Sequence, residues 1–92
     1  MNVSLKERFD EIRKEITAND AAIVAGVNHR LELVAELWEL KAKLGFDTVD
    51  PEREARLRAA LAAGNAGPLS EEGLSRLVTL LLELTKDELG AT

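Results

Sequence analysis

A long stretch near the N-terminus without any proline constrains the fold most. The first proline is Pro51, and Gly45 is the first convincing stop for a helix, since Gly26 falls within the helical pattern. Ser4 and Glu7 have the spacing of a capping box, in which two side chains satisfy free N–H groups at the start of a helix. The sequence therefore predicts one very long first helix over residues 5–43.

Apolar residues recur in steps of three and four along this predicted helix, which is typical of one buried helix face. They are Leu5, Phe9, Ile12, Ile16, Ile23, Val27, Val34 and Leu37. Three polar residues, Asn19, Arg30 and Lys41, fall in phase with this apolar face. A buried cation without an anionic partner is costly. Arg30 and Lys41 must therefore pair with a Glu side chain, extend to solvent, or bind a ligand.

The length of this helix predicts the quaternary structure. At about 1.5 Å per residue it would measure about 60 Å, whereas a compact monomer of this size has a radius of gyration of only about 12 Å. The later part of the chain is too short to cover such a rod. We therefore expect a second copy to cover the apolar face, in an intertwined homodimer with closed two-fold symmetry.

Two shorter helices are predicted in the second half of the chain. An N-cap residue followed by Pro51 begins a helix over residues 51–63, and the Gly- and Pro-containing run 64–68 ends it. Ser70 caps a third helix over residues 71–89. The expected buried face of this helix consists of Leu74, Leu77, Leu81, Leu84 and Thr85. The prediction is an all-α chain in which residues 1–92 form a single domain of three helices.

Composition excludes several classes of function. The net charge of -5 and the pI of about 4.9 argue against the basic surface that nucleic-acid binding requires. The chain has no Cys and a single His, which argues against disulfides, thiolate chemistry and a His-based metal site. No segment approaches the roughly 18 apolar residues of a membrane span, and the N-terminus does not have the pattern of a signal peptide. We expect a cytoplasmic protein.

The basic residues of the first helix are suited to holding a small anion. Arg30 and Lys41 are eleven residues apart, which places them within about 20° around the helix and about 16 Å along it. Arg53, at the start of the second helix, could reach an anion held between Arg30 and Lys41. Arg13 lies about 26 Å from Arg30 along the helix, so it would join them only from an antiparallel partner chain. Taken singly, each is more simply an ion-paired or solvated cation, and only the combination favours a binding site.

The spacing of these basic residues resembles that of a known family. Residues 9–54 resemble the all-helical chorismate mutases without a gap, and residues 69–89 resemble the third helix of that family. The matching residues are Arg13, Arg30, Lys41 and the run Asp50-Pro51-Glu52-Arg53-Glu54. The resemblance implies an isomerase that converts chorismate to prephenate in one pericyclic step, on the shikimate branch to Phe and Tyr. It implies no metal and no cofactor.

The resemblance also implies how the substrate is held. Chorismate is a dianion, and negative charge grows on its ether oxygen as the C–O bond breaks, so catalysis rests on positioning and electrostatic stabilisation. By this resemblance, Arg30 and Arg13 of the partner subunit hold the carboxylates. Lys41 donates to the ether oxygen and to a carboxylate. Arg53 adds positive field, and Thr85 supplies a hydroxyl to a carboxylate.

By the same resemblance, Glu54 and the backbone near Asp50 would bind the ring hydroxyl. One other position departs from the family pattern. The family usually has Gln or Glu one turn after the hydroxyl residue, as a second donor to the ether oxygen, but here this position is Leu89. Loss of one such donor costs about 3 to 4 kcal/mol of barrier stabilisation. Either the last turn of the third helix shifts, so that Glu88 enters the site in its protonated form, or the enzyme is intrinsically weak.

The Leu-Gly pair at the end of the third helix is similar to that of a small actinobacterial subgroup of these enzymes. Members of the subgroup are poorly active alone and are activated in complex with deoxy-arabino-heptulosonate-phosphate synthase. The resemblance therefore implies this synthase as a hypothetical activating partner.

The residues leave other functions open. Isochorismate-pyruvate lyase has the same fold and basic clamp and acts on an isomeric dianion. A helical dimerisation or regulatory module with a vestigial pocket would explain Leu89, but it would not need the other binding positions. An acidic coiled-coil adaptor would have no need of Arg13.

Overall fold

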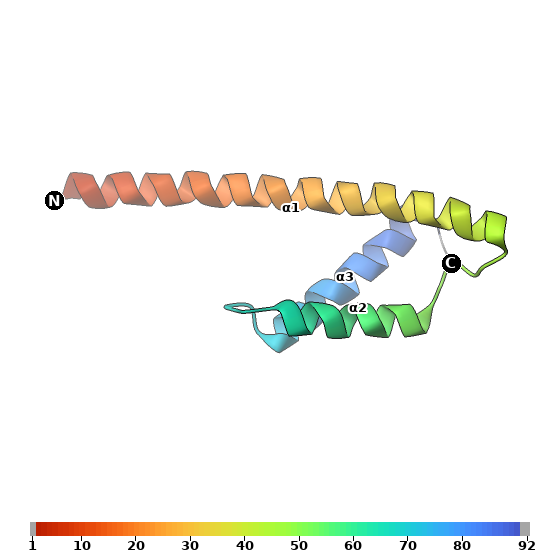
Figure 1. Ribbon diagram of the computed structural model, residues 1–92. Helices are drawn as coiled ribbons and strands as arrows, with labels where there is room; N and C mark the ends of the chain where they lie inside the picture. The colour runs from red at the N-terminus through yellow and green to blue at the C-terminus, as the bar shows by residue number, and fades with distance from the viewer. Residues whose placement is uncertain (1, 91–92) are drawn as a thin grey trace. The chain divides into compact units, whose positions relative to one another are not determined.

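The chain forms three α-helices joined by short loops. The structure, a computed structural model, describes the backbone of residues 2–90 and the side chains of residues 4–90. The helices are α1 (Asn2–Leu44), α2 (Pro51–Gly64) and α3 (Glu71–Leu89), in that order along the chain (Figure 1). Residues 2–90 contain no β-strand. The prediction of an all-α chain with three helices and a very long first one is confirmed.

The two ends of α1 fit the sequence prediction to different degrees. The helix already includes Asn2, so Ser4 lies inside it, and the predicted capping box at Ser4 is wrong. The other end stops at Gly45 as predicted, with a left-handed φ of 77°. Gly45 N donates to Ala42 O at 3.3 Å and Phe46 N donates to Lys41 O at 2.8 Å. This pair of bonds is a Schellman motif, which satisfies the last carbonyls of the helix.

The described chain divides into two compact units, of which the first ends at Arg30 and the second begins at Leu31. The first unit is wholly helical, and the apolar face predicted from sequence is open to solvent in the single chain. Leu5 is 73% exposed, Phe9 51% and Ile23 56%. The polar side chains form surface ion pairs such as Lys6–Asp10 at 3.2 Å, each of which contributes less than about 1 kcal/mol. Among residues 4–30, whose side chains the structure describes, the apolar side chains of this face stay largely exposed.

In the second unit, local capping chemistry begins and ends the two shorter helices. The Asp50 side chain accepts a hydrogen bond from Arg53 N at 3.2 Å, and Ser70 Oγ accepts one from Gly73 N at 3.0 Å. Gly90, with a φ of 75°, ends α3, and its N–H donates to Lys86 O. These caps explain why the observed starts of α2 and α3 coincide with those expected from sequence.

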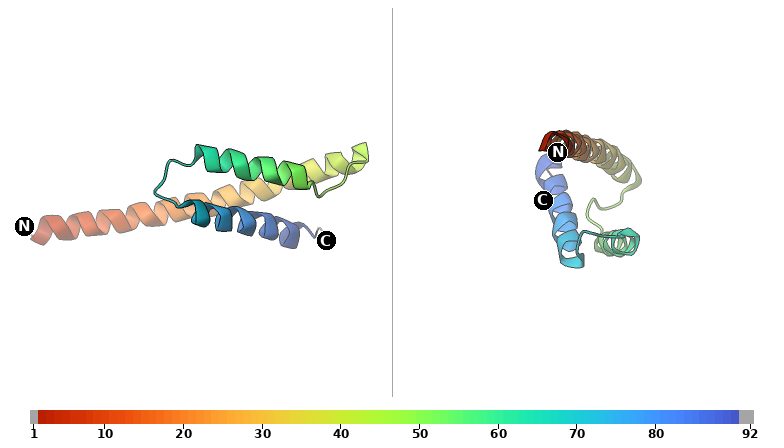
Figure 2. Two further views of the ribbon diagram at one scale, coloured as in Figure 1. Left: turned by 90° about the horizontal axis from the view of Figure 1, so that it is seen from below. Right: turned by 90° about the vertical axis from the view of Figure 1, so that its left-hand side faces the viewer.

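The contact between α2 and α3 holds the second unit together. The two helices run in opposite directions (Figure 2, left). Arg58 crosses from α2, where Nη1 donates to Ser75 O at 3.3 Å and Nη2 donates to Thr79 Oγ1 at 2.8 Å. Glu54 and Lys86 form a second link, with Oε1 and Nζ 3.6 Å apart.

The buried face of α3 differs from the predicted one. Val78 is the most buried apolar residue described and is 2% exposed, whereas Leu77, which was expected on the buried face, is 44% exposed. Val78 and Thr85 are two turns apart and therefore share one helix face, and this face is the one that is covered. Leu77 lies about 100° away from Val78 around the helix. The prediction that Leu77 is buried is wrong for the single chain.

Candidate active site

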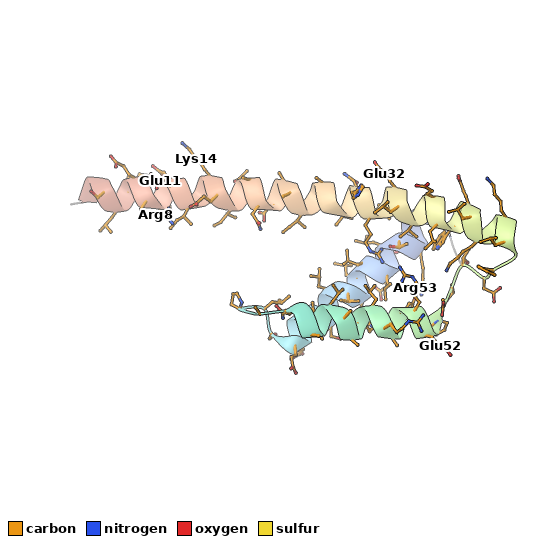
Figure 3. The ribbon with its side chains drawn as sticks, in the orientation of Figure 1. Arg8, Glu11, Lys14, Glu32, Glu52 and Arg53 are labelled. Carbon is orange, nitrogen blue, oxygen red and sulfur yellow. The ribbon has the colours of Figure 1, made fainter. Side chains whose placement is uncertain are left out.

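Arg13 lies in the first unit, on the exposed part of α1. Its guanidinium lies over the Phe9 ring, with Cζ 5.0 Å from the ring centroid, which is a cation–π contact one turn apart. The backbone carbonyl of Arg13 accepts a hydrogen bond from Thr17 Oγ1 at 3.0 Å. The long side chain is therefore supported on a helix surface that is open to another molecule. Figure 3 labels Arg8 and Glu11, which form an ion pair at 3.4 Å in the same part of α1.

Arg30 is the last residue of the first unit and is partly buried, in contrast to the exposed Arg13. The flat fork of a guanidinium can bind a carboxylate with two hydrogen bonds.

Lys41 stands in the last turn of α1, in the second unit, and is partly buried. Its Nζ donates to the backbone carbonyl of Thr48 at 3.3 Å. A carbonyl is a neutral acceptor, so this bond orients the ammonium group without cancelling its charge. The position at the C-terminal end of a helix favours a cation. The loop from α1 to α2 thus fixes the direction of the Lys41 side chain.

An open hollow lies where α1 ends and α2 begins. It has a volume of about 700 Å³, which is within the usual range for small-molecule sites. The residues that line it are Lys41, Gly45, Phe46, Asp47, Val49, Asp50, Pro51 and Glu52. Two of the residues predicted from sequence, Lys41 and Asp50, are therefore brought together at one hollow, although they are nine positions apart in the chain.

The start of α2 presents further predicted residues. The Asp50 side chain caps the helix, so its carboxylate accepts from Arg53 N. Arg53 itself is exposed, and it leaves α2 on a different side from Glu52 (Figure 3). Glu54 is partly buried and faces α3, where its Oε1 lies 3.6 Å from Lys86 Nζ.

Thr85 is placed on the covered face of α3. It is 5% exposed, and its hydroxyl donates to the carbonyl of Leu81 at 2.7 Å. This bond is one that Thr commonly forms inside helices. A hydroxyl oxygen is also an acceptor, and its proton changes direction by rotation about the Cβ–Oγ1 bond.

Lys86 was missed by the sequence analysis. It follows Thr85 in the last turn of α3 and pairs with Glu54 across the two helices. A basic residue in the last turn of a helix is a recognisable signal of helix stabilisation. Its pairing with Glu54 depends on how α2 and α3 align, which no local pattern contains.

The end of α3 remains regular helix through Leu89. Glu88 is exposed and Leu89 is partly buried. The last turn thus places Leu89 rather than Glu88 on the more covered side. Leu89 offers no hydrogen-bond donor there.

Two further features, a metal-binding cluster and a membrane-spanning helix, are absent from the described residues. Residues 2–90 contain no cluster of three or more His, Cys, Asp or Glu side chains suited to a metal ion. Among the described residues, no helix has the length and apolar character needed to cross a membrane.

Comparisons with known proteins identify the family. The sequence profile of chorismate mutase type II matches residues 12–88. A chorismate mutase from Thermus thermophilus, form I, superimposes with a TM-score of 0.81 at 31% identity, covering 85% of this chain and 98% of the other. Form II of the Thermus protein gives a TM-score of 0.84 at 29% identity, covering 92% and 97%. No curated protein sequence matches significantly. The chain belongs to the chorismate mutase type II family, whose members are isomerases.

Proposed function

We propose that this chain converts chorismate to prephenate at a site that two copies of the chain complete. The observation that supports this most directly is the hollow beside Lys41. There a charged ammonium group, oriented by a neutral carbonyl, faces an open space of small-molecule size. The family match, which covers residues 12–88, supports the substrate.

The proposed chemistry needs a cation at the reacting oxygen. In the rearrangement the ether C–O bond breaks while a C–C bond forms within the same molecule, and no group is transferred to the protein. Negative charge grows on the ether oxygen in the transition state. Lys41 would donate to that oxygen and stabilise the charge. Because Lys41 is held by the loop, little reorganisation accompanies the reaction.

The remaining groups would bind and orient the dianion. Arg30 would hold a carboxylate with two hydrogen bonds, and Arg53 would add positive field. Glu54 and the backbone at Asp50 would bind the ring hydroxyl, and Thr85 would contact a carboxylate. These contacts keep the enolpyruvyl arm folded over the ring, which is the geometry the reaction requires.

A homodimer would supply Arg13 and cover the exposed apolar face of α1. In the single chain, Phe9 and Ile16 are more than half exposed at 51% and 54%. A second helix packed antiparallel against this face would remove apolar surface from water at about 25 cal/mol per Å². The same packing would bring Arg13 of the partner subunit toward Arg30.

The first test is the replacement Arg30→Ala. We expect kcat/KM for chorismate to fall at least about 100-fold, because a substrate carboxylate loses its charged partner. The measurement is chorismate depletion, with prephenate identified as the product. Salicylate plus pyruvate formed by the wild-type protein from isochorismate, in place of prephenate from chorismate, would instead assign the isochorismate-pyruvate lyase activity.

A matched control for this variant is Arg8→Ala, also on α1. Arg8 is exposed and pairs only at the surface with Glu11 and Glu15. Its loss should change kcat/KM by less than about twofold, since surface ion pairs contribute little. Equal losses from Arg30→Ala and Arg8→Ala would contradict the assignment of Arg30.

The second test examines whether the site is shared between chains. Arg13→Ala and Lys41→Met should each be nearly inactive as homodimers. When the two are unfolded together and refolded as a mixture, half of the dimers are mixed, and one of the two sites in a mixed dimer is intact. About a quarter of the wild-type activity should therefore return.

The controls for this experiment are each variant refolded alone and the mixture combined without unfolding. Neither should regain activity if exchange of subunits is slow. Failure of the co-refolded mixture to regain activity, with dimers verified by light scattering, would show that Arg13 does not act across the interface.

A further inference from the structure

We propose that Lys86 is a positioning residue that holds the Glu54 carboxylate for the ring hydroxyl of the substrate. The inference rests on the proposed function, because it takes Glu54 as a substrate-binding group. Lys86 Nζ and Glu54 Oε1 are 3.6 Å apart, and their side chains are 41% and 30% exposed. The pair lies within the second unit and links the last turn of α3 to the first turn of α2.

The opposite directions of α2 and α3 bring Glu54 and Lys86 together. Glu54 stands near the N-terminus of α2, where the helix dipole favours an anion, and Lys86 stands near the C-terminus of α3, where it favours a cation. Because α2 and α3 are antiparallel, these two ends meet. Arg58, one turn after Glu54, bonds to Ser75 and Thr79 and holds the same two helices in register.

The geometry leaves Glu54 able to bind a ligand. At 3.6 Å the contact is an ion pair rather than a full hydrogen bond, for which N···O distances are about 2.7 to 3.2 Å. The contact involves Oε1, and a carboxylate has a second oxygen, Oε2, that can accept a hydrogen bond from a hydroxyl donor. Lys86 thus limits the rotamers of Glu54 without occupying the whole carboxylate.

Thr85 strengthens this assignment. It directly precedes Lys86 and is 5% exposed, so the backbone from which Lys86 extends is anchored in the packed face of α3. The C-terminal cap adds a second anchor, since Gly90 N donates to Lys86 O. A cation on a fixed backbone can direct a carboxylate in a way that a cation on a mobile loop cannot.

The expected signature is an effect on KM with little effect on kcat. The ring hydroxyl does not take part in bond making or breaking, so Glu54 binds ground state and transition state about equally. We expect Lys86→Met to raise KM about 5- to 10-fold and to change kcat less than about twofold. Lys86→Arg, which keeps the charge, should restore KM to within about twofold of the wild type.

A double-mutant cycle on the full-length protein tests whether Lys86 acts through Glu54. KM and kcat for chorismate are measured for Lys86→Met, Glu54→Gln and the double variant. We expect Glu54→Gln alone to raise KM about 10-fold, and Lys86→Met to add less than about twofold in that background. The matched control is Arg76→Met, which removes an exposed cation from α3 and should leave KM unchanged. Thermal unfolding of each variant separates loss of binding from loss of fold.

The outcomes separate this inference from the proposed function. If Glu54→Gln raises KM but Lys86→Met does not, the role of Lys86 is wrong and that of Glu54 stands. If Lys86→Met raises KM equally in both backgrounds, Lys86 contacts the dianion directly and the inference is overturned. If Glu54→Gln leaves KM and kcat unchanged, the assignment of Glu54 fails, and the role of Lys86 fails with it.

Discussion

Replacement of Lys41 by Met is expected to lower kcat about 1,000-fold, because the variant loses a charged donor to the ether oxygen. Met has a similar length and keeps the packing of the partly buried stem, so the loss reports on the ammonium group. The effect should appear mainly in kcat, since the charge on the oxygen develops only in the transition state. Single-turnover measurement of chorismate loss with enzyme in saturating excess over substrate gives this rate directly.

The neighbouring Lys43 provides the control for Lys41. Both lie in the last turn of α1, but Lys43 is exposed and does not line the hollow. Lys43→Met removes the same charge from the same helix end and should change kcat less than about twofold. A fall of less than about tenfold in Lys41→Met would show that another group stabilises the ether oxygen.

The replacement Leu89→Gln is expected to act in the opposite direction and to raise kcat about 100- to 1,000-fold. Leu89 is partly buried at the end of α3, and the resemblance to the family implies a second donor to the ether oxygen at its position. Gln can supply an N–H there without adding charge. The change leaves the Gly90 cap intact, since that bond uses the carbonyl of Lys86.

Leu80→Gln is the control for this substitution. It also puts an amide on α3, but at a position that is 51% exposed, so kcat should not rise. If Leu89→Gln has no more than a small effect, the low-activity interpretation of Leu89 is wrong.

The same pair of variants addresses the hypothetical synthase partner, since added deoxy-arabino-heptulosonate-phosphate synthase should accelerate the wild type more than Leu89→Gln. Absence of binding to a transition-state analogue would favour a non-catalytic dimerisation module.

Features governed by local chemistry could be predicted from the sequence. The starts of α2 and α3 depend on Asp50, Pro51 and Ser70, whose capping bonds are made within three residues. The stop at Gly45 depends on a left-handed backbone that glycine adopts without strain. The predicted start of α1 was wrong because Ser4 has the residue type and spacing of a cap whether or not the helix extends beyond it.

Features governed by the alignment of separate helices could not be predicted. Leu77 and Val78 are adjacent apolar residues, and only the direction from which α2 approaches decides which of them is buried. The pairing of Lys86 with Glu54 likewise joins residues far apart in the chain. Arg30 and Lys41 could be proposed from the sequence because both fall in phase with the apolar face of one helix, whose periodicity is visible in sequence.

The turn that closes α1 makes loop length a catalytic variable. The carbonyl of Lys41 accepts from Phe46 N, while its ammonium group reaches Thr48 O, so one residue both terminates the helix and carries the proposed catalytic charge. An inserted residue between Phe46 and Thr48 would therefore displace the cation even if every helix remained folded. Because Thr48 contributes its backbone carbonyl to this bond, its side chain can be exchanged in protein engineering, whereas the number of residues in the loop cannot be changed.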